Sequence, residues 1–327
     1  MKEIFKKAKK FICDPAIRLR YLSRAGLYNH MSDEKYLKKK FKLEMGKELD
    51  LDNPVTFNEK LQWLKIHDRK DAYTTLVDKY EVKDYVANVI GKEHIIPTLG
   101  VYNKFEDIDF DKLPNQFVIK CTHDSGGLVV CRDKSKLNKN AARKKINKSL
   151  KTNYYYSGRE WPYKNVKPRI LVEEYIDVSG DSKTSSGNKI TADELQRENG
   201  LLDYKFMCFD GVVKFFFLDI GVIGKGTGHA EEYYRNVYDR DFKLMPVLET
   251  RQNYPKEIVP PKNFKEMVAI AEKLSKGIPH IRVDLYNVDG KILFGEMTFY
   301  HGSGTTNYFE PAEWDKKIGD MINLPKK

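Results

Sequence analysis

The chain has 327 residues, of which 41% are hydrophobic and 32% are charged, and its net charge at pH 7 is +11. This composition excludes a disordered chain, and the length allows one large domain or two to three smaller ones. No apolar run approaches the roughly 18–20 residues that a membrane-spanning helix needs. The cysteines form no C-x-x-C pair, so we expect free thiols in a reducing cytoplasm: Cys13, Cys121, Cys131 and Cys208.

Two segments hold most of the positive charge. Residues 1–40 carry twelve Lys and Arg against four Asp and Glu, and residues 132–151 carry nine against one. Such segments occur in proteins that bind nucleic acids, anionic lipid surfaces or anionic substrates. The 132–151 segment contains no aromatic residue that could stack on bases, so we expect no nucleic-acid partner.

The first 50 residues are predicted to form a basic helical segment. Within residues 1–13 the lysines lie opposite apolar residues at helical spacing: Ile4, Phe5, Ala8, Phe11 and Ile12. Because lysines interrupt this segment throughout, we do not expect a secretory signal. Two interpretations remain open, a helix that packs against its own domain and a helix that lies on a membrane surface.

Helices and strands are mixed along the rest of the chain. Thr56 and Glu59 have the spacing of a capping box, which predicts the start of an amphipathic helix. Further helices are predicted at 78–90, around Ala142, Ile146 and Leu150, and at 263–276. Strands or hairpins are predicted at 93–102, 115–132, 169–176, 203–219 and 281–298, with loops at 181–200 and 221–229. This mixture predicts an α+β fold rather than a doubly wound sheet.

The hairpin at 281–298 carries two acids inside its apolar strands. A bulge or a three-residue turn would bring Asp284 and Glu296 onto one side, roughly opposite each other. Two adjacent buried carboxylates repel each other, and a divalent cation removes that cost. Magnesium prefers one or two carboxylates with water and substrate phosphate. Arg282 and Thr298 lie two residues from the acids, which favours a functional site over a half-exposed sheet.

Three further segments contain candidate binding residues. Lys120 ends an apolar strand and precedes a turn with Gly126 and Gly127, a pattern that suits phosphate binding but does not match a Walker A loop. Lys205 lies two residues after Asp203 in a very apolar hairpin, where it either reaches the solvent edge or meets an anion. The acids in Glu173-Glu174-Tyr175-Ile176 end a strand, where they could accept hydrogen bonds from an adenine amine or a ribose hydroxyl.

The order of these segments resembles the ATP-grasp family from about Leu113 to Thr306. It is most similar to the TupA-like branch, which is associated with teichuronopeptide and capsular-polysaccharide biosynthesis. NPVTFNEKLQWLK, the DKY helix, IIPTLGVY and FGEMTFYHGSG extend the resemblance back to about Leu51. The resemblance implies two α+β subdomains that clasp ATP and activate a carboxylate as an acylphosphate.

Roles for individual residues follow from the resemblance. Lys120 and Lys205 are expected to contact the triphosphate, and Arg282 to steady the transferring phosphoryl group, with Lys205 and Arg282 as the catalytic residues. The lid loop and the nucleotide pocket are expected to comprise His123, Ser125, Gly126, Gly127, Glu173, Glu174, Tyr175 and Ile176. Asp284, Glu296 and Thr298 are expected to bind Mg²⁺, although the family usually has Asn where this chain has Thr298. Apart from the resemblance, the small residues and hydroxyls of the loop after the hairpin at 281–298 suit an acceptor carboxylate or a tetrahedral intermediate, and a flexible turn is the alternative; the loop contains His301, Gly302, Ser303 and Gly304.

The domain organisation expected from the resemblance has three parts. These are the basic segment 1–50, a reduced N-terminal lobe at 51–112 and an ATP-grasp domain at 113–327, divided into a lid-bearing part at 113–172 and a metal-binding part at 173–327. The chain lacks the full nucleotide-fold domain that usually precedes the grasp region, so its acceptor must be recognised differently.

The function expected is that of an ATP- and Mg²⁺-dependent carboxylate–amine ligase of bacterial capsule or cell-envelope biosynthesis. It would join an amine or amino acid to a uronic-acid glycan or its activated precursor, in the cytoplasm or on the inner face of the membrane. Two alternatives remain, a glycosyltransferase or other glycan-assembly enzyme and an ATP-dependent phosphotransferase. The hairpin at 281–298 has no D-x-D motif, which speaks against the glycosyltransferase.

Overall fold

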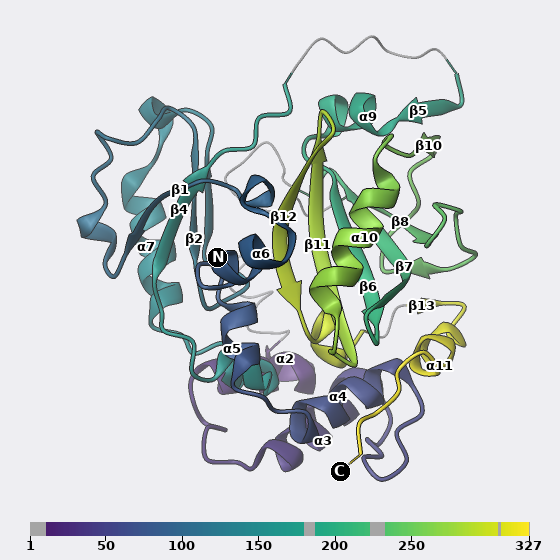
Figure 1. Cartoon of the computed structure of the whole chain (residues 1–327). Helices are drawn as coiled ribbons and strands as arrows, with labels where there is room; N and C mark the ends of the chain where they lie inside the picture. The colour runs from purple at the N-terminus through teal and green to yellow at the C-terminus, as the bar shows by residue number, and fades with distance from the viewer. Residues whose placement is uncertain (1–10, 180–186, 223–232, 307–308, 327) are drawn as a thin grey trace.

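The computed structural model describes residues 11–179, 187–222, 233–306 and 309–326. A four-stranded and a five-stranded antiparallel sheet lie in different halves of the molecule (Figure 1). Helices from the N-terminal part of the chain lie beneath both sheets. The fold is α+β, as predicted. None of the described helices is long and apolar enough to cross a bilayer. The predicted helix at 1–13 lies mainly outside the described residues.

The smaller sheet has the strand order β1-β4-β2-β3. Its strands are β1 (Thr98–Tyr102), β2 (Phe117–Cys121), β3 (Leu128–Cys131) and β4 (Ile170–Glu174). The basic helix α7 (Lys139–Leu150) packs on one face through Ala142 and Ile146, and its lysines and Arg143 are directed away from the core. Figure 1 shows α7 on the outer side of this sheet. The opposite face is therefore available to line a cleft with the larger sheet.

The larger sheet has the strand order β12-β11-β6-β7-β8. Its strands are β6 (Asp203–Phe209), β7 (Val212–Ile220), β8 (Tyr234–Asp239), β11 (His280–Val288) and β12 (Lys291–Thr298). Helix α10 (Phe264–Ser275), predicted at 263–276, crosses one face of this sheet, and the apolar residues of one side of the helix are buried: Phe264, Met267, Val268, Ala271 and Leu274. The predicted hairpin at 203–219 turns at Asp210-Gly211, which joins β6 to β7, and the turn at Asp289-Gly290 joins β11 to β12.

Helices α2 (Pro15–Arg24), α3 (Asp33–Met45) and α4 (Phe57–His67) lie beneath the sheets in Figure 1. The chain then rises through α5 (Ala72–Val77) to α6 (Val82–Ile90), which lies between the smaller sheet and β12. The predicted capping box at the start of α4 is confirmed, since the Glu59 amide donates to Thr56 Oγ1 and the Thr56 amide donates to Glu59 Oε2. The predicted helix at 78–90 begins at Val82 rather than at residue 78.

Short elements complete the chain. They are α8 (Tyr155–Gly158), β5 (Lys189–Thr191), α9 (Ala192–Asn199), β9 (Leu248–Glu249), β10 (Glu257–Val259), β13 (Phe309–Glu310) and α11 (Trp314–Gly319), with 3₁₀ turns at Lys92–His94, Phe105–Asp107, Lys134–Lys136, Trp161–Tyr163 and His301–Gly304. The prediction of a loop across 181–200 is wrong for residues 189–199, which form β5 and α9. Thr191 and Glu194 form a second capping box, which starts α9 and buries Leu195.

Candidate functional site

Three neighbouring cavities form the candidate site. The first is an apolar slot between the two sheets, and the second is a polar cavity that contains the hairpin acids. These two share the residues Lys120, Leu128, Asp203, Val222 and Tyr286. The third cavity extends toward α2 and α3, and it shares Tyr233, Arg235 and Arg282 with the polar cavity. A ligand could therefore run from an apolar end through a charged centre to a second polar space.

The apolar slot has the composition expected for a flat, uncharged group. Val118 and Val130 from the smaller sheet and Leu201, which shortly precedes β6 of the larger sheet, line its walls. Glu174, Tyr175 and Ile176, which were predicted from sequence to surround a nucleobase, line the same slot; Glu174 is the last residue of β4 and the other two follow it. The structure thus brings the three residues together in the slot, where Glu174 supplies a carboxylate at the end of the apolar strand β4.

Lys120 and Glu173 lie where the apolar slot meets the polar cavity. Lys120 Nζ is 2.7 Å from Glu173 Oε2, and Lys83 Nζ from α6 is 2.6 Å from Glu173 Oε1. Burial opposes ionisation of Glu173, but the two lysines outweigh it and lower the pKa of this carboxyl group. Glu173 therefore holds Lys120 in position at the polar cavity. Lys83, which also pairs with Glu173, is a residue of the site that the sequence analysis missed.

The hairpin acids occupy the centre of the polar cavity. Asp284 pairs with Glu296 in the β11–β12 register, and the register shifts directly afterwards because Gly295 is an extra residue. Of the two predicted ways to bring the acids together, a three-residue turn or a bulge, the structure has the bulge. Arg282 donates to Asp284 Oδ1 at 2.6 Å and to Glu296 Oε1 at 2.8 Å, while Thr298 Oγ1 donates to Glu296 Oε1 at 3.1 Å. Burial opposes ionisation of Glu296, but the Arg282 guanidinium outweighs it and lowers the pKa of Glu296 to about 2.

Lys205 connects the hairpin acids to a third carboxylate. Its Nζ donates to Asp284 Oδ2 at 2.8 Å and also to Asp203. Burial raises the pKa of Asp203 to about 7, because the attraction of Lys205 is offset by the negative charges of Asp284 and Asp219. The neighbouring carboxylates raise the pKa of Lys205 against the effect of burial, so the lysine is charged at neutral pH. Lys205 and Asp203 both face the polar cavity.

The donor set of the polar cavity fits magnesium. Within the described residues no three His, Cys, Asp or Glu side chains could enclose one ion, but magnesium needs only one or two carboxylates when phosphate and water supply the rest. The connected charges include five carboxylates and three cations: Asp203, Asp219, Glu249, Asp284 and Glu296, with Lys205, Arg235 and Arg282. Asp203 Oδ1 is buried without a hydrogen-bond partner among the described residues. Asp203, Asp284 and Glu296 therefore bring carboxylate oxygens to one place in the cavity, where a divalent cation would contact them.

The predicted lid loop is divided between the cavity and the protein interior. Ser125 and Gly126 are exposed and line the polar cavity, as does Gly127. Gly127 approaches its neighbours closely, because an added Cβ would lie 2.6 Å from Cys121 Sγ and from Ser149 Oγ. His123 is buried on the other side, where Nε2 lies 3.2 Å from the carbonyl oxygens of Ser149 and Thr152. The structure thus does not bring His123 to the cavity.

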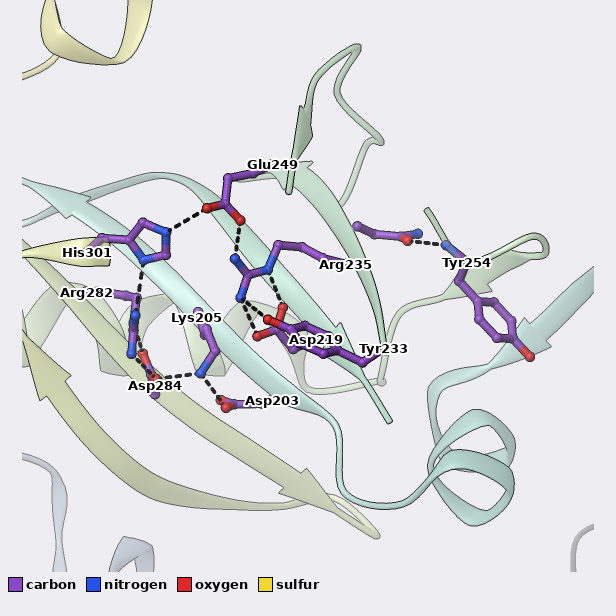
Figure 2. Close-up of polar contacts among 11 residues, drawn as sticks. Asp203, Lys205, Asp219, Tyr233, Arg235, Glu249, Tyr254, Arg282, Asp284 and His301 are labelled. Carbon is purple, nitrogen blue, oxygen red and sulfur yellow. Dashed lines mark hydrogen bonds and ion pairs between the residues drawn. The ribbon is translucent and has the colours of Figure 1, made fainter. Parts of the chain in front are cut away.

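A buried charged network links the polar cavity to the third cavity (Figure 2). Arg235 from β8 makes a bidentate ion pair with Asp219 from β7 and also contacts Glu249 from β9. His301 Nε2 lies 3.5 Å from Glu249 Oε1, and Arg282 donates to His301 Nδ1 at 3.1 Å. Since a guanidinium only donates, Nδ1 is the acceptor and Nε2 carries the hydrogen of a neutral imidazole. Burial lowers the pKa of His301, in agreement with this state.

The loop that follows β12 is held by α4. Asn58, Gln62 and Lys65 lie on one face of this helix at helical spacing. Asn58 Nδ2 donates to the Thr306 carbonyl at 2.9 Å, Gln62 Nε2 to the Gly304 carbonyl at 2.5 Å, and Lys65 Nζ to the Ser303 carbonyl at 2.9 Å. The polar residues at helical spacing in NEKLQWLK could have indicated this contact, but the sequence analysis did not use them.

The predicted acceptor loop thus has two faces. His301 and Gly302 line the third cavity, together with Thr305 and Thr306. Ser303 and Gly304 are directed toward α4, and Gly302, Ser303 and Gly304 all have positive φ, between 55° and 60°. Side-chain hydrogen bonds therefore hold this loop in one conformation, in which Ser303 adopts a positive φ that costs energy for a residue other than glycine.

Comparisons with known proteins identify one family. A model of the TupA-like ATP-grasp family matches residues 59–323, and no curated protein matches the chain. Among solved structures, D-cycloserine synthetase is 15% identical over 76% of this chain and 70% of its own, with a TM-score of 0.39. D-alanine–D-alanine ligase from Bacillus anthracis complexed with ATP is 16% identical over 76% and 63%, with a TM-score of 0.37. L-amino acid ligase from Bacillus licheniformis is 13% identical over 76% and 50%, with a TM-score of 0.42.

Proposed function

Because the chain belongs to the TupA-like ATP-grasp family, we propose that it is an ATP- and Mg²⁺-dependent carboxylate–amine ligase of surface-polysaccharide biosynthesis. One observation carries this proposal, namely the order of the three cavities. An apolar slot, a cavity with cations and paired acids, and a further polar cavity follow one another and share lining residues. This order suits a nucleobase, a magnesium-bound triphosphate and an acceptor.

The nucleotide is proposed to lie across the first two cavities. Its base occupies the slot beside Glu174, Tyr175 and Ile176, and its phosphates extend past Lys120 toward Lys205. Both lysines line the polar cavity, where point charges stabilise phosphate without a covalent step. Ser125, Gly126 and Gly127 face the same cavity and would lie over the phosphates. His123 is left out of this proposal because it is buried against Ser149 and Thr152.

Asp284 and Glu296 are the residues proposed to hold magnesium, with Thr298 orienting Glu296 through its hydrogen bond. The ion would neutralise phosphate charge as it develops during transfer. Arg282 presently bonds to both acids, and it also lines the polar and the third cavity. A guanidinium at that junction suits a phosphoryl group that passes from ATP to the acceptor.

The reaction proposed has two steps. An oxygen of the acceptor carboxylate forms a bond to the γ-phosphorus, and the bond from that phosphorus to the bridging oxygen of ADP breaks. An amine then forms a C–N bond at the acyl carbon, the C–O bond to phosphate breaks, and the amine loses a proton. Positioning and charge neutralisation are sufficient for this chemistry, so no protein nucleophile is needed.

The acceptor is proposed to be a uronic-acid glycan or its activated precursor, and the second substrate an amine or amino acid. The TupA-like family and the resemblance of NPVTFNEKLQWLK and FGEMTFYHGSG to it support this choice. The net charge of +11 also suits an anionic acceptor. We place the enzyme in the cytoplasm, with peripheral contact to the membrane through residues 1–13.

Release of ADP from Mg·ATP tests the proposed function. The purified protein is incubated with a panel of uronic acids and amines, added singly and in pairs. A ligase needs both substrates for release, a phosphotransferase needs only the acceptor, and a glycosyltransferase releases none. Mass spectrometry of the surface glycan from cells with and without the protein then identifies the amide substituent that is lost.

A further inference from the structure

We propose that helix α2 supplies Arg20 to the acceptor cavity as a binding residue for a second anionic group, distinct from the carboxylate that reacts. This inference rests on the proposed function and specifies its acceptor. The acceptor would then carry two acidic groups. The second group is either the carboxylate of a neighbouring uronic acid or the diphosphate of an activated sugar.

The third cavity is built by segments that lie far apart in the sequence. Arg20 and Asp14 at α2 and Leu43 and Glu44 on α3 form one side, while His301, Gly302, Thr305 and Thr306 form another. The cavity measures about 660 Å³, which lies within the range of roughly 300–1,000 Å³ for small-molecule sites. Lys40 from α3 donates to Thr305 Oγ1 at 3.2 Å, so the N-terminal helices dock directly on the loop that follows β12.

Arg20 is held at this cavity by the packing of its own helix. Leu19 and Ser23, which flank it on α2, are buried. Tyr36 from α3 is fully buried and donates to Ser23 Oγ at 2.8 Å, and its hydroxyl also lies 3.2 Å from the Ser157 carbonyl. The contact with Tyr36, which also bonds to Ser157, therefore fixes the orientation of α2, and α2 in turn forms a fixed wall of the cavity.

The other charges of the cavity are already engaged. The Asp14 carboxylate caps α2 through the amides of Ala16 and Ile17, and Glu44 pairs with Lys40 Nζ at 2.9 Å. Arg235, Arg282 and Glu249 belong to the buried network that contains Asp219, Asp284 and His301. These groups hold the walls in place and have few hydrogen-bonding positions left for a ligand.

Arg20 differs from the other charged residues of the third cavity because its guanidinium is only weakly engaged. Within the part of the chain that the structure describes, its ion pair is with Glu44, and the distance from Nε to Oε1 is 3.8 Å, which is too long for a hydrogen bond. Its side chain is 54% exposed, and a guanidinium has five N–H donors in a planar fork. This arrangement suits a bidentate contact with a carboxylate or phosphate that enters the cavity.

The position of Arg20 gives it a role separate from that of Arg282. Arg282 lines both the polar cavity and the third cavity, whereas Arg20 lines only the third. The reacting carboxylate must meet the phosphates and therefore lies at the Arg282 end. An anion at Arg20 belongs to another part of the acceptor, so Arg20 selects the acceptor without taking part in phosphoryl transfer.

Calorimetry with the full-length protein tests this inference. The protein is first saturated with Mg²⁺ and AMP-PNP and is then titrated with galacturonate, digalacturonate, glucuronate or UDP-glucuronate. We expect wild type to bind digalacturonate or UDP-glucuronate about tenfold more tightly than the matching monoacid, and the compound that does so identifies the source of the second anion. Arg20→Ala should abolish this preference, and Arg20→Lys should retain part of it.

Arg24→Ala is the matched control, because Arg24 is an exposed arginine of α2 that does not line the cavity. It should bind all four probes as wild type does. Equal affinity of wild type for mono- and dianionic probes would overturn the inference, as would an equal loss in the Arg24→Ala variant. A wild-type protein that fails to bind AMP-PNP would overturn the proposed function itself, which is a separate result.

Discussion

Asp284 and Glu296 face each other across β11 and β12, and a single guanidinium, that of Arg282, bonds to both at 2.6–2.8 Å. All three side chains line the polar cavity at the centre of the proposed site. The guanidinium offsets the repulsion between the two carboxylates, so they can lie beside each other. The arrangement also keeps the arginine next to the position proposed for magnesium and phosphate.

Removing either acid should abolish turnover. Asp284→Asn and Glu296→Gln keep the volume of the side chain but remove its charge, so we expect at least about a hundredfold loss of ATP consumption with the fold preserved. The matched control is Glu266→Gln, which removes an exposed acid from the first turn of α10. Near-normal ATP consumption by both site variants would show that the metal assignment is wrong.

Lys120→Met should weaken the binding of ATP more than that of adenosine, because the lysine is proposed to meet phosphate rather than base. We expect about a tenfold loss for ATP in equilibrium binding and no change for adenosine. Glu173 retains Lys83 as a partner in this variant, so the fold should persist. Lys136→Met, which removes an exposed lysine, is the control. An equal loss for the two ligands would indicate a folding defect instead.

Gly304→Ala should destabilise the protein through the turn after β12. Gly304 has a φ of 60°, and an added Cβ would lie 2.9 Å from Leu61 Cβ and would also meet Gln62 Nε2. We expect the free energy of unfolding in urea to fall by about 2–4 kcal/mol. Gly46→Ala isolates the backbone term, because Gly46 has a φ of 71° and open space around it, and should cost about 1 kcal/mol. Equal costs would mean that α4 does not restrain the turn.

Glu296 should contribute stability that is lost in acid. Its pKa is lowered from 4.5 to about 2 in the folded state, so the contribution is fully present above about pH 4.5 and declines as the pH falls toward 2. Because 38% of the side chain is exposed, solvent screening reduces the contribution to about 1 kcal/mol.

Urea unfolding of wild type and Glu296→Gln across this pH range measures the effect. The stability difference between them should be largest near neutral pH and should shrink below pH 4.5. Glu266→Gln, measured in parallel, should show no such convergence. A difference that stays constant or grows in acid would contradict the ion pair with Arg282.

Deletion of residues 1–13 should release the protein from anionic vesicles. Asp14, which caps α2, is retained in this variant, so α2 should still form. Three large apolar side chains near α2 are exposed, namely Ile12, Tyr21 and Leu27, and each nearby basic residue adds about 1 kcal/mol on an anionic surface. Vesicle flotation at low salt is the measurement. Binding that survives the deletion, or no binding by wild type, would contradict the membrane role, whereas insoluble expression would favour a helix that packs on its own domain.

Local features of the site could be predicted from the sequence. The Asp-Gly turns, the capping box at Thr56 and the bulge that pairs Asp284 with Glu296 depend on residues close together in the chain. The apolar face of α10 likewise follows from its spacing. These patterns reflect backbone geometry within one helix or hairpin, which a single sequence records.

The remaining parts of the site depend on contacts between distant segments. Arg235 meets Glu249 and Asp219 only because β7, β8 and β9 come together, and Lys83 reaches Glu173 from a separate helix. The hydrogen bonds from α4 to the loop after β12 join residues more than 200 positions apart. No period or short motif marks such pairs. The position of Arg20 was unpredictable for the same reason, since an exposed arginine on a short helix has no distinctive pattern.

Transfer of ¹⁸O from the acceptor tests the central claim most directly. Galacturonate and digalacturonate labelled with ¹⁸O in their carboxylates are incubated with the protein, Mg·ATP and hydroxylamine, and the inorganic phosphate is analysed by mass spectrometry. If the carboxylate is activated by phosphoryl transfer, each phosphate released should contain one ¹⁸O, and a hydroxamate should form in equal amount. Unlabelled phosphate, or release of ADP that does not depend on the acid, would contradict carboxylate activation at this site.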